Sequence, residues 1–285
     1  YFMARVRFMT SPSQTSPSLA RIQSFAFSGI EAVPVTVEVQ LSSGLPAFLV
    51  VGLADKSVGE ARERVRAALT AMGLALPPKR ILINLVPADL LKEGAHFDLP
   101  IAIALLVAMG IIPFESACAY AAVGELSLDG RINPVAGVLS AALGSVELDL
   151  GLVCPASQGR EARWGAPEAD ILAPATLAEL VAHFRGDQVL TPVPDAEANA
   201  PDYGPDLSDV KGMAIGRRAL EIAAAGGHSL LMSGPPGAGK SMLASRLAGI
   251  LPDLTREEML ETSRIHSVSG MLKDGRLVSR PPYRA

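Results

Sequence analysis

Apolar and polar residues alternate strictly between Val33 and Leu41. The odd-numbered positions are four valines and a leucine, and the even-numbered positions between them are Pro, Thr, Glu and Gln. This period of two predicts a half-buried β-strand. Apolar runs at 48–53, 80–86 and 120–126 predict further strands, and the Asp129-Gly130 pair that follows predicts a tight turn.

Residues 57–72 show the period of an α-helix instead. The sequence Ser57-Val-Gly-Glu60 predicts a capping box at its start, and Gly73 predicts its end. The outer face carries Arg62, Arg64 and Arg66 beside two glutamates, which predicts a solvated surface; contact with nucleic acid is the alternative. The apolar face consists of Val58, Ala61, Val65, Ala68, Leu69 and Met72.

One apolar run stands out by its length, from Leu99 to Pro113. It is too short to span a bilayer and is interrupted by Pro100, so it predicts a buried helix. Alternating short strands and helices then continue to Arg185. Together these elements predict one α+β or α/β domain over residues 25–186.

The two ends of this domain differ from it in composition. Residues 1–24 are rich in Ser, Pro and Thr and lack the apolar segment of a secretory signal, which predicts a disordered leader. Because residue 1 is Tyr, we expect Met3 or Met9 to be the natural start. Residues 187–205 are rich in prolines and acids, which predicts an extended linker.

A second domain is predicted over residues 206–285. Its expected elements are a helix at 213–225, a strand at 228–233, a helix beginning at Lys240, a helix opened by a Thr255–Glu258 capping box and a hairpin at 272–278. Between the predicted strand and the helix at Lys240 lies the sequence GPPGAGKS, residues 234–241. The order of strand, glycine loop and helix is the one that a phosphate-binding loop requires.

The chemistry of this loop follows from its residue types. Glycines let successive backbone N–H groups turn towards phosphate oxygens, and the helix N-terminus behind them favours anions. Lys240 is expected to hold the β- and γ-phosphates of ATP as the catalytic lysine, and Ser241 to ligate Mg²⁺. The predicted nucleotide-binding residues are Gly234, Pro235, Pro236, Gly237, Ala238, Gly239, Lys240, Ser241 and Met242.

Composition and charge limit the class of protein, the metal and disulfide chemistry and the compartment that we expect for this chain. The chain of 285 residues is 49% apolar with a formal charge of −4, which predicts a globular protein without global attraction to nucleic acid. Cys118 and Cys154 form no C-x-x-C pair and the four histidines form no H-E-x-x-H motif, so neither a disulfide framework nor a zinc site is indicated. The expected compartment is the reducing cytoplasm, with no membrane partner.

Three stretches resemble the ComM/YifB family of magnesium-chelatase-like AAA+ ATPases. They are residues 52–66, residues 84–103 and the region from Asp206 through the GPPGAGKS loop. The resemblance implies a Lon-protease-like (ribosomal S5-type) domain at 25–186, followed by an incomplete P-loop AAA+ domain. It also implies a homo-hexameric helicase that acts on branched or single-stranded DNA in homologous recombination and natural transformation. Met213 departs from the family, which more often has Gln there, beside the adenine pocket.

The Lon-like part of the resemblance raises the question of peptidase activity. Aligned through the Gly94 loop, the position of the serine nucleophile falls at Asp98; aligned through Pro134–Gly137, that of the lysine falls at Leu139. A carboxylate opposite an aliphatic side chain cannot form the nucleophile and base of acyl transfer. We therefore expect a non-peptidase scaffold or substrate-positioning module, with Asp98 as a helix N-cap.

Three functions remain open at this point. The first is an ATP-driven DNA motor, and the second is a magnesium-chelatase or protein-remodelling ATPase subunit. The third is a truncated product that is not an enzyme, because no apolar run after Ser241 ends in the second acid that a P-loop ATPase needs. We expect the chain as given to lack hydrolysis. The Lon-like first domain favours the DNA motor, since that domain is absent from chelatase ATPase subunits, and the reading frame beyond Ala285 would identify a truncated product.

Overall fold

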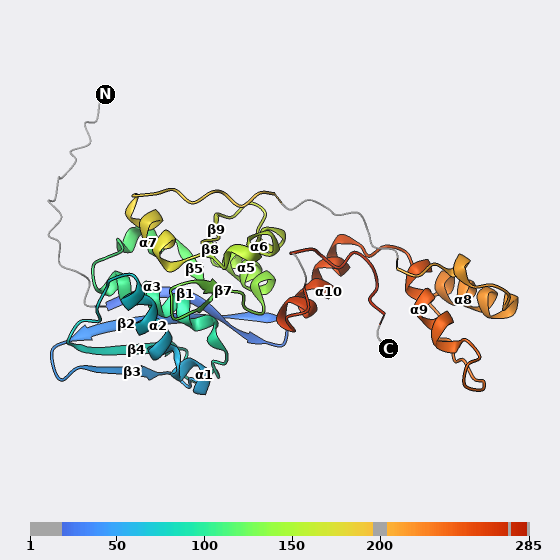
Figure 1. The fold of residues 1–285 in the computed structure, drawn as a ribbon, viewed down its shortest axis with the longest axis horizontal. Helices are drawn as coiled ribbons and strands as arrows, with labels where there is room; N and C mark the ends of the chain where they lie inside the picture. Colours follow the sequence, from blue (N-terminus) through green and yellow to red (C-terminus); the bar gives the residue numbers. More distant parts are fainter. Residues whose placement is uncertain (1–18, 196–203, 273–274, 284–285) are drawn as a thin grey trace, which may run out of the picture.

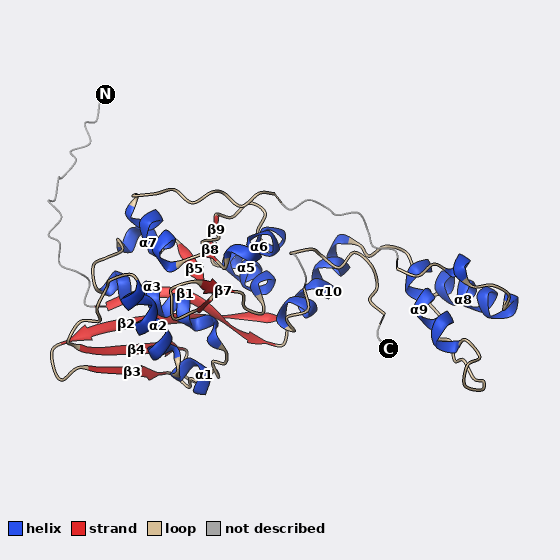
Figure 2. Cartoon of the chain, viewed as in Figure 1, coloured by secondary structure: helices blue, strands red, loops and turns tan. Residues whose placement is uncertain are grey.

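The computed structural model describes residues 19–195, 204–272 and 275–283. Figures 1 and 2 show a β-sheet with helices on both faces, joined to a smaller helical part. The strands are β1 (Leu19–Ser28), β2 (Glu31–Ser42), β3 (Ala47–Val51), β4 (Arg80–Val86), β5 (Tyr120–Ala122), β6 (Glu125–Leu126), β7 (Ile132–Asn133), β8 (Gly151–Val153) and β9 (Ile171–Leu172). The helices are α1 (Lys56–Gly59), α2 (Ala61–Ala71), η1 (Ala95–Phe97), α3 (Asp98–Ala108), α4 (Phe114–Ala117), α5 (Val138–Glu147), η2 (Ala156–Gln158), α6 (Gly159–Gly165), α7 (Leu177–Arg185), η3 (Leu207–Asp209), α8 (Ala214–Gly226), α9 (Lys240–Ile250) and α10 (Arg256–Val268).

The large sheet is mixed, in the order β3-β4-β2-β1-β5-β8-β9. The β1–β2 and β2–β4 pairs are antiparallel, and the other four pairs are parallel. The alternation predicted at 33–41 is confirmed inside β2, where Val35, Val37 and Val39 are fully buried. The strand predicted at 80–86 coincides with β4, and β6 and β7 form a separate hairpin around the predicted turn.

Both faces of the sheet are covered in the first domain. On one face, α3 packs against β1 and β2, α2 packs against α3, and α7 adds buried apolar side chains to the same core. On the other face, α5 and α6 pack over Phe25, Ala121 and Leu152. All eleven residues of α3 are buried, which confirms the helix that the apolar run predicts. Burial of apolar surface on both faces stabilises this domain.

Several boundaries differ from the sequence predictions. The leader was predicted to reach residue 24, but β1 begins at Leu19 and pairs with β2 from that residue onward. Residues 1–18 lie outside the described residues. The predicted linker at 187–205 also begins too early, because Val193 is buried and the Arg163 guanidinium donates to its carbonyl oxygen. Residues 196–203 of that segment lie outside the described residues.

Two predicted helix starts are wrong for local reasons. The capping box at Ser57 does not form; Asp55 accepts from the Val58 N–H and caps the short α1, and α2 begins separately at Ala61. Asp98 is the first residue of α3 rather than its N-cap, which is Phe97. The predicted strand at 120–126 is divided into β5 and β6, which belong to different sheets.

The described residues from 204 onward form helices joined by loops, and no strand. Residues 228–233, predicted as a strand, lie in no strand, and neither do the described residues around the predicted hairpin, Leu272 and 275–278; residues 273–274 lie outside the description. A strand requires a neighbour for its backbone hydrogen bonds, and the described residues after 204 contribute none to either sheet. Leu231 is therefore 93% exposed.

Candidate nucleotide-binding site

The GPPGAGKS sequence forms an exposed loop that ends at the N-terminus of α9. Gly237 and Gly239 have φ angles of 78° and 81°, a region that glycine adopts without steric cost. The Ala238 N–H donates to the Pro235 carbonyl at 3.3 Å, which closes the turn. The chain then enters α9 at Lys240, as predicted.

Gly239 is restricted in a second way. A Cβ atom placed on it would lie 3.2 Å from the Met213 Sδ and 3.4 Å from the Met242 Cε. Met213, the residue that departs from the family pattern, therefore packs against the loop, at the N-cap of α8. A small cluster of Leu207, Val210, Leu220 and Leu243, with Met232, Leu247 and Ile250 against it, holds α8, α9 and η3 together behind the loop.

The start of α9 presents unpaired donors. Leu243 N–H donates to the Gly239 carbonyl, so the N–H groups of Lys240, Ser241 and Met242 precede the first helical hydrogen bond. The Lys240 ammonium group donates to the carbonyl oxygens of Gly234 and Pro235, at 2.8 Å each. These two bonds bring the cation over the loop beside the unpaired N–H groups.

These features fit a triphosphate with its Mg²⁺ ion. The helix is 11 residues long, its first N–H groups are unpaired, and a lysine is held at its start. An added Cβ on Gly237 would meet no atom within 4 Å, and one on Gly234 would meet only the Ala238 Cβ at 3.6 Å, so the space above the loop is open for a ligand. Ser241 is exposed in the first turn of α9, where its hydroxyl is free to ligate the metal ion.

The two positions of a Lon-type dyad are occupied in a different way. The Asp98 carboxylate is fully buried and accepts from Arg64 at 2.5 and 3.0 Å and from the Leu126 N–H at 3.2 Å. Burial raises the pKa of Asp98, and the hydrogen bond from Arg64 opposes that effect. Leu139 is buried in α5. Arg64, predicted to lie on a solvated face, is thus the counter-ion of a buried acid.

A second buried acid connects α10 to the first domain. The Glu161 Oε1 accepts from the Ser267 hydroxyl at 2.5 Å and from the Leu139 N–H at 3.2 Å, and its Oε2 accepts from Gln158 at 3.1 Å. Burial raises the pKa of Glu161, and these donors lower it. Arg264 of the same helix donates to the Ile30 carbonyl at 3.0 Å. Sequence reasoning missed this contact, because an acid in α6 and a serine in α10 share no motif.

The described residues also bear on metal binding, disulfide formation and membrane insertion. Among the described residues, no group of three His, Cys, Asp or Glu side chains could hold a metal ion. Cys118 and Cys154 are both free thiols, the first exposed and the second buried. No helix in the described part of the chain is long and apolar enough to cross a membrane.

Two family profiles match separate parts of the chain. The profile described as "Subunit ChlI of Mg-chelatase" matches residues 37–158, and the profile described as "Magnesium chelatase, subunit ChlI" matches residues 206–285. The first match lies in the mixed α/β domain, and the second covers the GPPGAGKS loop and the helices around it. The chain therefore has the N-terminal domain and part of the AAA-type region of this class of proteins.

Individual relatives are similar over most of the chain. A Salmonella typhimurium protein named YifB is 43% identical over 251 residues, which are 88% of this chain and 49% of the relative. A Mycobacterium tuberculosis protein is 41% identical over 270 residues, 94% of this chain and 54% of the relative. The Competence protein ComM of Haemophilus influenzae is 41% identical over 256 residues, which are 88% of this chain and 50% of the relative.

The chain belongs to the ComM/YifB family of magnesium-chelatase-like proteins. It spans about half the length of the curated relatives that it matches. The resemblance found in the sequence is thereby confirmed.

Proposed function

We propose that this chain is the nucleotide-binding part of an ATP-driven motor that acts on branched or single-stranded DNA in homologous recombination and natural transformation. The observation that carries the proposal is the loop at 234–241, with left-handed glycines, unpaired N–H groups and Lys240 at one helix start. The similarity to a protein named as a competence protein supports the choice of DNA as substrate.

Each residue of the site has a definite part in this proposal. Bound ATP supplies the phosphoanhydride bond whose hydrolysis drives the motor. The N–H groups at the start of α9 bind and orient its phosphates, Lys240 neutralises charge on the β- and γ-phosphates, and Ser241 ligates the Mg²⁺ ion. The other proposed contacts are the backbone of Gly234–Gly239 and the side chain of Met242, which packs beside Gly239.

The remaining features of the motor are proposals for the full-length protein. The domain before the loop would be a Lon-protease-like scaffold that positions substrate without cutting peptides, because Asp98 is engaged by Arg64. The assembly would be a cytoplasmic homo-hexamer. Hydrolysis requires a second acid and a neighbouring arginine. No apolar run after Ser241 ends in such an acid, so we expect this chain by itself to bind ATP without hydrolysing it.

The experiment is phosphate release by the full-length protein, with and without a four-way DNA junction. We expect the junction to stimulate hydrolysis and Lys240→Ala to abolish it, while Lys79→Ala, which alters an exposed lysine of the first domain, leaves it unchanged. A protein that hydrolyses ATP but ignores the junction would refute the DNA motor.

A second candidate is a chelatase or protein-remodelling ATPase, favoured by the descriptions of both matching family profiles. It predicts stimulation of the same hydrolysis by a protein partner instead of by DNA. The phosphate-release assay therefore separates the two candidates.

A further inference from the structure

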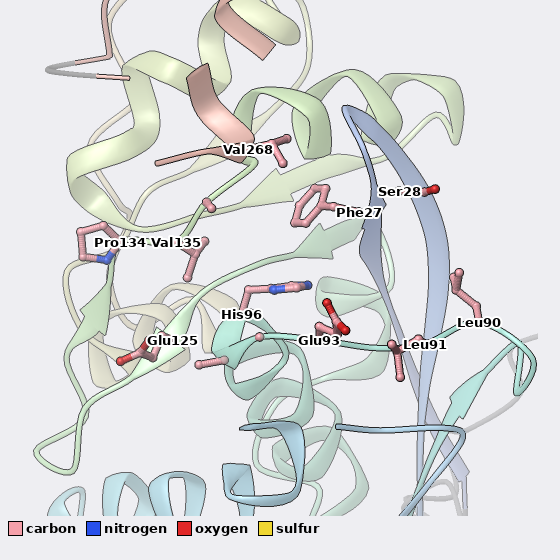
Figure 3. A pocket seen from close by; sticks show the side chains of 13 residues that line it. Phe27, Ser28, Leu90, Leu91, Glu93, His96, Glu125, Pro134, Val135 and Val268 are labelled. Atoms are coloured by element: carbon pink, nitrogen blue, oxygen red, sulfur yellow. The ribbon is translucent and has the colours of Figure 1, made fainter. Parts of the chain in front are cut away.

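A pocket of about 620 Å³ lies in the first domain, on the side of the sheet where α10 ends (Figure 3). Its walls come from the end of β1, η1 and the segment before it, Glu125 of β6, the segment after β7 and the last residue of α10. The lining residues are Phe27, Ser28, Leu90, Leu91, Glu93, Gly94, Ala95, His96, Glu125, Pro134, Val135, Ala136 and Val268. No described residue of the nucleotide loop is among them, so the proposed ATPase does not account for this pocket.

A buried imidazole forms part of the wall. His96 is 6% exposed, and its Nε2 lies 2.8 Å from the Phe25 carbonyl oxygen, which can only accept. The Nε2 therefore carries the hydrogen. Burial lowers the pKa of His96 to about 4, so the ring is neutral at physiological pH and its Nδ1 is a lone-pair acceptor without a partner among the described residues.

This Nδ1 atom lies next to a glycine. A Cβ on Gly94 would lie 3.1 Å from it, and the φ of Gly94 is 93°. Glycine thus leaves the nitrogen uncovered on the pocket side. The ring of Phe27 packs on His96 with centroids 5.1 Å apart, and Figure 3 shows the Glu93 carboxylate beside the imidazole, with Glu125 farther away on the other side.

Apart from the Ser28 hydroxyl, which can also donate, the polar side chains of the pocket accept hydrogen bonds or carry negative charge. Glu93 and Glu125 are carboxylates, the Nδ1 of His96 is an acceptor, and none of the thirteen lining residues is Lys or Arg. Such a wall selects a ligand that donates hydrogen bonds and is positively charged. The rest of the wall is apolar and comes from Phe27, Leu90, Leu91, Val135 and Val268.

We propose that this pocket binds a protein segment in which one Lys or Arg side chain is flanked by apolar residues. The cation would reach the acceptors around His96, and the flanking side chains would cover the apolar walls. A free polyamine offers only short methylene spacers between its charges and no branched apolar side chain for those walls, so a peptide fits better. Because Val268 is the last residue of α10, the pocket is complete only while that helix is docked.

The test uses the peptide acetyl-Leu-Arg-Leu-amide and the full chain. Titration calorimetry measures its affinity, and the ¹⁵N resonances of the His96 ring report its location. We expect saturable binding that shifts the Nδ1 resonance. Replacing the arginine of the peptide by neutral citrulline should weaken binding at least tenfold.

The variant arm replaces both carboxylates, as Glu93→Gln with Glu125→Gln. Binding should fall at least tenfold, while the control pair Glu115→Gln with Glu147→Gln, both exposed elsewhere on the domain, should bind as the parent does. Should the first pair fail to fold, the citrulline peptide on the unaltered chain remains decisive. Absence of saturable binding, indifference to citrulline, or equally tight binding of spermidine with the same Nδ1 shift would each overturn the proposal.

Discussion

The Arg64–Asp98 ion pair offers the sharpest test of how the first domain is held together. The Asp98 side chain is 0% exposed and that of Arg64 is 20% exposed, so the substitution Arg64→Met leaves a carboxylate buried with only the Leu126 N–H as a donor. Breaking a buried pair in this way costs about 3–5 kcal/mol. Because one donor remains, we expect about 3 kcal/mol, which lowers the Tm of a domain of this size by about 6–12 °C.

The pH dependence of this loss has a definite sign. Burial already raises the folded-state pKa of Asp98 above its ordinary value of 3.8, and Arg64 opposes that rise. A carboxyl group whose pKa is higher in the folded than in the unfolded protein stabilises the fold when the pH is below its unfolded-state pKa. This stabilisation is lost as the pH rises through the pKa of Asp98 in the folded protein. Removal of Arg64 raises the folded pKa further. The deficit of Arg64→Met should therefore be largest at neutral pH and shrink on acidification towards pH 4.

The assay is urea unfolding followed by circular dichroism at pH 7 and pH 5. Arg66→Met is the matched control, because Arg66 lies on the same helix and is exposed. A variant at Arg64 that is as stable as this control at pH 7 would refute the reasoning. So would a deficit that grows as the pH falls.

Three further results are expected. Ser267→Ala removes a donor from the buried Glu161 carboxylate; this should cost about 1–3 kcal/mol and speed hydrogen exchange along α10, and unchanged exchange would argue against the docked helix. Gly239→Ala should weaken ATP binding by about 5- to 30-fold, because an L-residue at its φ of 81° costs about 1–2 kcal/mol and its Cβ meets Met213; normal affinity in a fluorescent-nucleotide titration would contradict this. Limited proteolysis should degrade α8 and α9 before the first domain, since Leu231 is 93% exposed; equal resistance by mass spectrometry would count against it.

Local sequence patterns predicted the elements that depend on neighbours in the chain. The alternation at 33–41 became part of β2, the Thr255–Glu258 capping box formed at α10, and the start of α9 at Lys240 followed from the loop motif. Each of these features is determined within a few residues, through side-chain period or a local hydrogen bond.

Features that depend on distant partners were not predicted. The pairing of Arg64 with Asp98 joins residues 34 positions apart, and that of Glu161 with Ser267 joins residues 106 apart. The strand expected at 228–233 fails for a related reason, because its apolar pattern is suitable but no described strand lies beside it. The residue pattern of a segment indicates which side chains it can bury. Whether another element covers those side chains depends on the rest of the fold.

The central claim is that the loop at 234–241 binds ATP through Lys240. Its most direct test is the affinity of this chain for a fluorescent ATP analogue with Mg²⁺, measured for the unaltered chain, for Lys240→Ala and for the exposed control Lys79→Ala. We predict saturable binding by the unaltered chain and the control, with at least tenfold weaker binding by Lys240→Ala, because a methyl group cannot replace the charge on the phosphates. Equal affinity of all three chains, or no binding by the unaltered one, would contradict the account.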